Sequence, residues 1–197
     1  MIDNFEKIKE LLKFGEDTYY FIQIIQRKKD HGGKGLDLRR WSKFLVRLDE
    51  LDLLKNDIQE LCQVYGGRAY IELNPRSLKK FTVCMMRKYL DRIYYQDYSN
   101  VYSIQNQVAL SEDTIKTKGI IERRRWMLDV DRKEDIVRVE EWIKEKGIVV
   151  EGCIPTISGQ HFIIQAGDLG LEFDKDIDLG KGTVFQLKST ANTLLWV

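Results

Sequence analysis

The apolar residues of the chain follow two spacings, one typical of helices and one typical of strands. Apolar residues three and four positions apart predict helices. The ranges with this spacing are 3–14, 37–65 in two pieces, 76–95 and 133–146. Short runs rich in β-branched and aromatic residues predict strands. The ranges with this character are 19–26, 68–73, 125–131, 148–154, 160–165, 183–188 and 193–197.

The order of these elements predicts an α+β fold built from two modules. Residues 1–110 are expected to form an N-terminal αβαβ module. Residues 111–197 start with the order βαββ, which is typical of an RRM-like (ferredoxin-like) β-sheet module. We expect the two modules to pack against each other as one compact unit. The polar, tyrosine-rich stretch 96–124 connects them, with some helix around 111–118.

Composition and charge describe an ordinary protein with a substantial core. The 197 residues are 43% hydrophobic and 32% charged, and the formal net charge is +1. This charge gives no sign of a generally basic nucleic-acid-binding protein, so local clusters matter more. The three cysteines contain no CxxC pair, which excludes a zinc knuckle and a disulfide framework.

The N-terminal segment and the lengths of the apolar runs argue against a membrane or secretory protein. Residues 1–6 carry no apolar core of a signal peptide. No apolar run approaches the roughly 20 residues that a membrane-spanning helix needs. We therefore expect a soluble, cytoplasmic protein without a membrane partner.

Two carboxylates at the end of the predicted strand 125–131 are the strongest chemical feature. Side chains alternate along a strand, so Asp129 and Asp131 share one face and Val130 takes the other. Two such carboxylates repel each other unless a cation or basic group lies between them, and Mg²⁺ or Mn²⁺ prefers oxygen ligands. The pair therefore predicts a metal site. The alternative is a helix cap or a salt bridge, because a predicted helix follows Asp131.

A second segment, Ser158-Gly159-Gln160-His161, leads into the predicted strand 160–165. Glycine lets backbone N–H groups approach an anion closely, so Gly159 favours phosphate binding here. Ser158 and His161 would hold the phosphates that a metal on the aspartates carries. The alternative for a lone histidine in an apolar run is a core residue with its hydrogen bonds satisfied.

Basic residues offer further phosphate ligands. Arg76 follows Asn74-Pro75 at the start of a predicted helix, where N-terminal amides and an arginine side chain bind phosphate. The clusters 27–29 and 123–125 would balance phosphate charge if they flank the aspartate strand. The alternatives are a simple helix cap near Arg76 and solvated surface charge at the two clusters.

Together, the two segments resemble the catalytic core of the archaeo-eukaryotic primase (primase-polymerase) superfamily. The family's first motif, apolar-Asp-apolar-Asp, is similar to 128–131, and its Ser-to-His motif is similar to 158–161. The resemblance implies an αβ module packed on an RRM-like module that holds both motifs. It also implies Asp129 and Asp131 as metal ligands and Ser158 and His161 on the triphosphate. The chain would be a small, stand-alone and divergent member, of the kind that phages or mobile elements carry.

The chain departs from this family at the third motif, an apolar-Asp pair on a later strand that completes the metal site. The corresponding strand, 183–188, contains no carboxylate. Acidic residues upstream of it are candidate substitutes. They are Asp168, Glu172, Asp174, Asp176 and Asp178. A missing third carboxylate would weaken the binding of a second metal ion and could abolish transfer.

Three functional hypotheses follow. The first is a primase-polymerase-like nucleotidyltransferase of DNA replication. In it, Asp129, Asp131 and His161 act with Mg²⁺ or Mn²⁺ on NTP or dNTP, and single-stranded DNA or RNA serves as the template. The second is a non-catalytic nucleic-acid-binding or replication-accessory module that uses the aspartates structurally. The third is a metal-dependent hydrolase of nucleotides or RNA ends, with water as the nucleophile.

Overall fold

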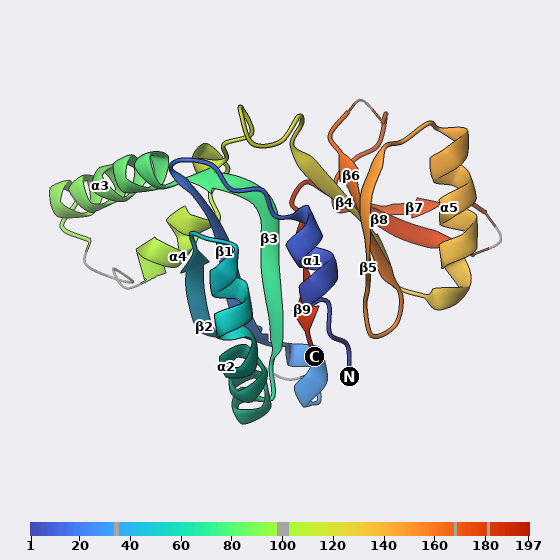
Figure 1. Cartoon of the computed structure of the whole chain (residues 1–197), viewed down its shortest axis with the longest axis horizontal. Coiled ribbons are helices and arrows are strands. Elements are labelled where there is room, and N and C mark those ends of the chain that lie inside the picture. The colour runs from blue at the N-terminus through green and yellow to red at the C-terminus, as the bar shows by residue number, and fades with distance from the viewer. Residues whose placement is uncertain (34–35, 98–102, 168, 181) are drawn as a thin grey trace.

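In the part of the chain that the structure describes, two antiparallel β-sheets, one of four strands and one of five, form the centre of the molecule (Figure 1). The structure is a computed structural model, and it describes residues 1–33, 36–97, 103–167, 169–180 and 182–197. Helices pack on both sheets. The α+β class predicted from the sequence is therefore confirmed.

The first sheet places its most apolar strand at the centre. In spatial order its strands are β2 (Leu38–Leu45), β1 (Thr18–Gln26), β3 (Arg68–Ser77) and β9 (Asn192–Trp196). Alternation along β1 sends Tyr20 and Ile22 into one hydrophobic cluster and Tyr19 and Phe21 into another. β1 is therefore buried on both faces, which accounts for its nearly continuous apolar run.

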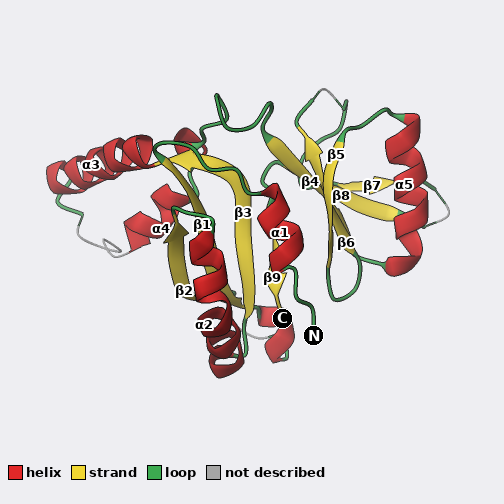
Figure 2. Cartoon of the chain, in the orientation of Figure 1, coloured by secondary structure: helices red, strands yellow, loops and turns green. Residues whose placement is uncertain are grey.

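Helices cover both faces of this sheet. On one face, α1 (Phe5–Leu11) and α2 (Asp49–Tyr65) pack against the Tyr20 side of β1. On the other face, α3 (Leu78–Tyr94) and α4 (Ile104–Ala109) meet the Tyr19 side, and α3 extends away from the sheets (Figure 2). Among the described residues, 3₁₀ helices include η1 (Lys28–His31), η3 (Glu112–Thr114) and η4 (Lys133–Asp135). Within the described ranges, no helix combines the length and the apolar character needed to cross a bilayer.

The prediction of helix over 37–65 is wrong in its first part. Residues 38–45 form β2, which pairs with β1, and the helix is confined to 49–65. Within β2, Trp41 and Leu45 join the cluster on the α2 side, whereas Phe44 joins the opposite cluster. A short segment whose apolar residues lie three and four positions apart also fits an edge strand with apolar residues on both faces. Pairing with β1 decides between the two.

β3 also runs further than the predicted strand 68–73. It continues to Ser77, and α3 begins at Leu78 instead of residue 76. The hydroxyl of Ser77 accepts a hydrogen bond from the Lys80 N–H at 3.1 Å, which caps the helix. Arg76 therefore lies within a strand and not at a helix N-terminus.

The second sheet carries the aspartate strand at its centre. In spatial order its strands are β5 (Val150–Pro155), β6 (Gln160–Gln165), β4 (Arg125–Val130), β8 (Val184–Lys188) and β7 (Asp176–Asp178). Helix α5 (Ile136–Glu145) covers one face, where Val139 and Ile143 pack with Leu128 and Phe162. The predicted βαββ order at the start of this unit is observed, and its RRM-like identity stays a prediction.

The two sheets share one hydrophobic core. Met127 of β4 and Ile163 of β6 belong to the same cluster as Ile22 of the first sheet. The last strand, β9, which the sequence analysis grouped with the module 111–197, pairs with β3 in the first sheet. The segment 111–197 therefore contributes strands to both sheets, and its final strand brings the two chain termini close together (Figure 1).

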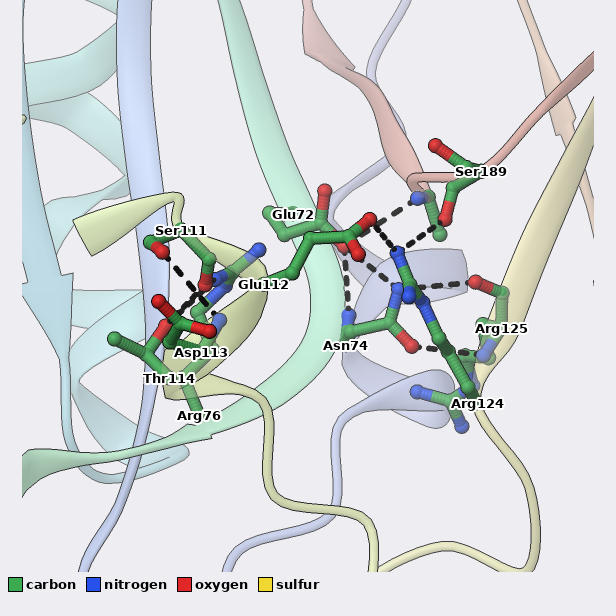
Figure 3. A network of polar contacts seen from close by, with 11 residues as sticks. Glu72, Asn74, Arg76, Ser111, Glu112, Asp113, Thr114, Arg124, Arg125 and Ser189 are labelled. Carbon is green, nitrogen blue, oxygen red and sulfur yellow. Dashed lines mark hydrogen bonds and ion pairs between the residues drawn. The ribbon is translucent and has the colours of Figure 1, made fainter. Parts of the chain in front are cut away.

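A buried polar network fastens β4 to β3 where the sheets meet (Figure 3). The carboxamide of Asn74 accepts a hydrogen bond from the Arg125 N–H at 2.7 Å and donates to the Arg125 carbonyl at 3.0 Å. It also donates to the carboxylate of Glu72 at 2.8 Å, and the Arg125 guanidinium donates to the Leu73 carbonyl at 2.9 Å. Glu72, Asn74 and Arg125 are buried, so these bonds form with little competition from water.

Replacing Asn74 by alanine should lower the free energy of unfolding by about 2–4 kcal/mol, because Glu72 and the backbone of Arg125 would be left with unmet hydrogen bonds. Urea denaturation followed by circular dichroism measures the change. The matched control is Asn56→Ala on the exposed side of α2, which should change stability by less than about 0.5 kcal/mol. Equal stabilities of the two variants would contradict the role given to the network.

Candidate functional site

A cavity of about 300 Å³ opens where the two sheets meet, and polar side chains dominate its walls. One wall comes from the first sheet: the end of β1, β3 and β9. The facing wall comes from β4, from the turn between β5 and β6, and from the chain that leads out of β8. The volume lies at the lower end of the range for small-molecule sites.

Asp129 and Asp131 both line this cavity. Along β4, Met127 packs toward the first sheet, whereas Leu128 and Val130 pack beneath α5. By alternation Asp129 is on the Met127 side, and its side chain is 26% exposed. Asp131 follows the last residue of β4 and is exposed. The structure thus brings the two predicted carboxylates to one polar space, on the face that the strand pattern predicts.

His161 lies directly beside Asp129, because the two residues are cross-strand partners on β6 and β4. Its Nε2 is 3.2 Å from Oδ1 of Asp129, and its Nδ1 is 2.7 Å from the hydroxyl of Thr193 on β9. Neutral histidine that carries its proton on Nε2 satisfies both partners, since it donates to Asp129 and accepts from Thr193. His161 is therefore a hydrogen-bonded link between the two sheets as well as a residue of the cavity wall.

The turn between β5 and β6 lies against the end of the aspartate strand. Thr156 and Ser158 line the cavity from this turn. A Cβ atom on Gly159 would stand 1.8 Å from the carbonyl oxygen of Val130, a separation that no side chain tolerates. Glycine is required here because two backbones touch. Gly159 does not line the cavity itself. By allowing the close contact, it places Ser158 near Asp131 in the cavity wall.

Three cations line the cavity opposite or beside the carboxylates: Arg27, Arg68 and Lys188. Arg27 belongs to the basic cluster 27–29, which the sequence analysis expected to balance phosphate charge if it flanked the aspartates. Burial disfavours its charged form. The Tyr70 hydroxyl, 3.2 Å away, and the carboxylate of Asp37 outweigh that cost, so the pKa of Arg27 is raised. The guanidinium therefore stays charged inside the cavity wall.

The other predicted basic residues lie elsewhere. Arg76 is buried and does not line the cavity; its guanidinium donates to the Thr114 hydroxyl at 2.7 Å. Arg124 pairs with Glu112 at 2.6 Å, and Arg125 belongs to the network between the sheets (Figure 3). These arginines hold residues 111–114 and the sheet interface in place, and none of the three reaches the aspartates.

Gln186 occupies the position on β8 directly opposite Asp129, on the same face of the sheet. Its carboxamide donates a hydrogen bond to Asp176 of β7 at 2.6 Å. Asp176, a candidate for the missing third carboxylate, therefore lies one strand further from Asp129 than Gln186 does. Asp174 pairs instead with Lys188 at 3.0 Å. Asp168 lies outside the described residues. Within them, no group of three or more His, Cys, Asp or Glu side chains is arranged to hold a metal ion.

The donor set nevertheless fits a metal ion that arrives with phosphates. Mg²⁺ is commonly bound by one or two carboxylates together with water and substrate phosphate oxygens, and seldom by an all-protein cage. Asp129 and Asp131 could supply the carboxylates. Arg27, Arg68 and Lys188 are each ion-paired with an aspartate outside the cavity lining, and they could supply positive charge for phosphates. Two carboxylates leave most positions of an octahedral ion to water or to a bound anion.

Sequence reasoning missed several residues of the cavity. Arg68 and Tyr70 lie two positions apart on β3, so they share a face, but nothing in the sequence relates that face to the aspartates. Lys188 ends β8, the strand on which the family resemblance predicts a carboxylate and not a cation. Asn192 lines the cavity because β9 crosses into the first sheet. A long-range pairing of this kind has no local signal.

Comparison of the chain with protein-family models, with curated proteins and with solved structures gives no match. The chemistry of the cavity is therefore inferred from its own side chains.

Gly159→Ala should destabilise the protein by about 3 kcal/mol or more, because the turn must move away from Val130 to make room for the methyl group. Thermal unfolding and the free energy of unfolding in urea measure the effect. Gly167→Ala is the matched control, since a Cβ atom there meets nothing within 4 Å. If the two alanine variants are equally stable, the turn does not lie as close to β4 as described.

Proposed function

We propose that the cavity between the sheets binds a nucleoside triphosphate with Mg²⁺ or Mn²⁺, and that the protein is a primase-polymerase-like nucleotidyltransferase. The observation that carries this proposal is the convergence of Asp129, Asp131, Ser158 and His161 on one cavity. These residues come from two separate segments, and the sequence alone predicts all four as site residues. The resemblance to the primase-polymerase family rests on the same four positions.

The polar walls give each group a role. Asp129 and Asp131 would hold the divalent cation, which would offset the negative charge of the phosphates and of the transferring group. Ser158, on the turn fixed by Gly159, would donate a hydrogen bond to a phosphate oxygen. Arg27 and Arg68, from the first sheet, would pair with the triphosphate from the other side. His161 keeps the Asp129 carboxylate oriented through the 3.2 Å contact.

A second candidate function is a nucleotide-binding or nucleic-acid-binding accessory module without transferase activity. Gln186 favours it, because an amide stands on the strand opposite Asp129 and the described residues offer no third carboxylate there. Two-metal phosphoryl transfer places both ions about 3.5–4 Å apart and needs enough charge to bind both. In this candidate the cavity binds the triphosphate but does not transfer it. The hydrolase hypothesis has no observation of its own to favour it.

The first test is calorimetric titration of Mn²⁺ and ATP into the wild-type protein and into Asp129→Asn. We expect triphosphate binding that requires the metal and that weakens about tenfold or more in the variant, because one of two charged ligands is lost. Asp178→Asn is the matched control. It lies in the other Asp-apolar-Asp sequence, on the exposed edge strand β7, and does not line the cavity.

Binding that survives in excess EDTA, or that is equally tight in Asp129→Asn, would sink the metal–triphosphate site. Where the site is present, primer extension separates the two candidate functions. Extended products that disappear in Asp131→Asn support the transferase. Metal-dependent binding without extension supports the accessory module.

Gln186→Asp tests whether the amide limits the metal site. It places a third carboxylate across from Asp129, where the Cβ atoms of directly opposed residues lie roughly 4.5–5.5 Å apart. We expect Mn²⁺ affinity in the presence of ATP to rise about tenfold. Gln186→Ala removes the amide without adding charge, and Gln165→Asp adds a carboxylate on β6 away from the cavity. A rise in affinity in either control would show that the added carboxylate at 186 is not the cause.

A further inference from the structure

Helix α3 is anchored along one side only. None of its 17 residues is buried, although the helix is rich in apolar side chains. Phe81 on its inner side packs against the first sheet. The centroid of its ring lies 5.0 Å from that of Phe44 and 5.9 Å from that of Tyr19. The rest of the helix extends from the body of the protein (Figure 2).

The outer side of α3 carries a continuous apolar stripe. Val83, Met86, Leu90 and Ile93 are 47%, 62%, 65% and 61% exposed. Their spacing of three, four and three residues is the a/d spacing with which one helix packs along another. A stripe of this length and regularity on an exposed helix indicates an interface with a second helix.

Charge limits what that second helix can be. α3 carries five basic residues and one acidic residue. Two copies of α3 packed together would bring two strongly positive helices into contact, which like charges oppose. The favourable partner is an acidic helix with apolar positions of its own.

The chain contains such a helix in α2. It has the same length as α3, 17 residues, with five acidic residues and one basic residue. Its outer side exposes Leu53 and Val64, at 72% and 70%, eleven positions apart and therefore on one face about three turns apart. Asp57 and Glu60 lie between them on that face and are exposed. On α3 the exposed Arg87 lies one turn after Val83, along the flank of the apolar stripe.

We propose that α3 of one copy packs against α2 of a second copy. The Val83–Ile93 stripe covers Leu53 and Val64, and Arg87 pairs with Asp57 and Glu60 of the other copy. A twofold axis makes the reciprocal contact at the same time, so the assembly closes as a dimer. This interface includes neither Asp129 and Asp131 nor any residue of the cavity lining, so it does not depend on the proposed nucleotide site.

Sedimentation equilibrium of the full chain tests this assignment. The wild type should dimerise reversibly, and Leu90→Glu and Arg87→Glu should each weaken dimerisation about tenfold or more, because an apolar contact or a charge pair is replaced by a negative charge. Val137→Glu is the matched control, since Val137 is 64% exposed on α5, away from both surfaces. All these positions are exposed, and circular dichroism verifies that each variant folds.

Charge reversal identifies the partner surface. Asp57→Arg with Glu60→Arg should weaken the dimer, and combining these changes with Arg87→Glu should restore a large part of the affinity. A chain that stays monomeric at all accessible concentrations overturns the proposal. A dimer that responds to the α3 variants but not to the α2 variants also overturns it, because α3 would then contact something other than α2.

Discussion

The two hydrogen bonds between the Asn74 carboxamide and the backbone of Arg125 fix the distance between the sheets, and the cavity depends on that distance. Arg125 is the first residue of β4, the strand that carries Asp129. Asn74 lies on β3, the strand that carries Arg68 and Tyr70. A side-chain amide here does what a backbone pair does within a sheet. It holds β4 in register with a strand that belongs to a different sheet, and so sets the carboxylates opposite the cations.

Strand β9 provides a second link of a different kind. It completes the first sheet beside β3, yet its Thr193 hydroxyl meets His161 of the second sheet at 2.7 Å. His161 in turn contacts Asp129, so the orientation of a proposed metal ligand is coupled to a strand in the other sheet. The hydrogen bonds of Asn74 and of His161 each connect the two sheets. A substrate that contacted both cavity walls would therefore bind between sheets whose relative position is already fixed.

The face on which Asp129 lies could be predicted because side-chain alternation is a local property of a strand. The apolar residues Leu128 and Val130 point into the core, so Asp129 and Asp131 point to the opposite face. The placement of Ser158 and Gly159 just before the strand 160–165 could be predicted for the same reason. The strand 38–45 was mistaken for helix because its apolar residues fit both spacings, and only the pairing with β1 distinguishes them. The role of Arg76 and the cavity positions of Arg68, Lys188 and Asn192 depend on strands that meet across long stretches of sequence, which leave no local pattern.

The placement of β9 also has a consequence for how the protein is made. During synthesis, β1, β2 and β3 leave the ribosome early, but the edge of β3 that pairs with β9 has no partner until residues 192–196 emerge. At ~5–20 residues per second, that edge waits on the order of ten seconds. Throughout this time its free N–H and C=O groups can pair with another extended chain. Until residues 192–196 pair with it, this edge of the nascent first sheet is open to mispairing and to chaperone binding.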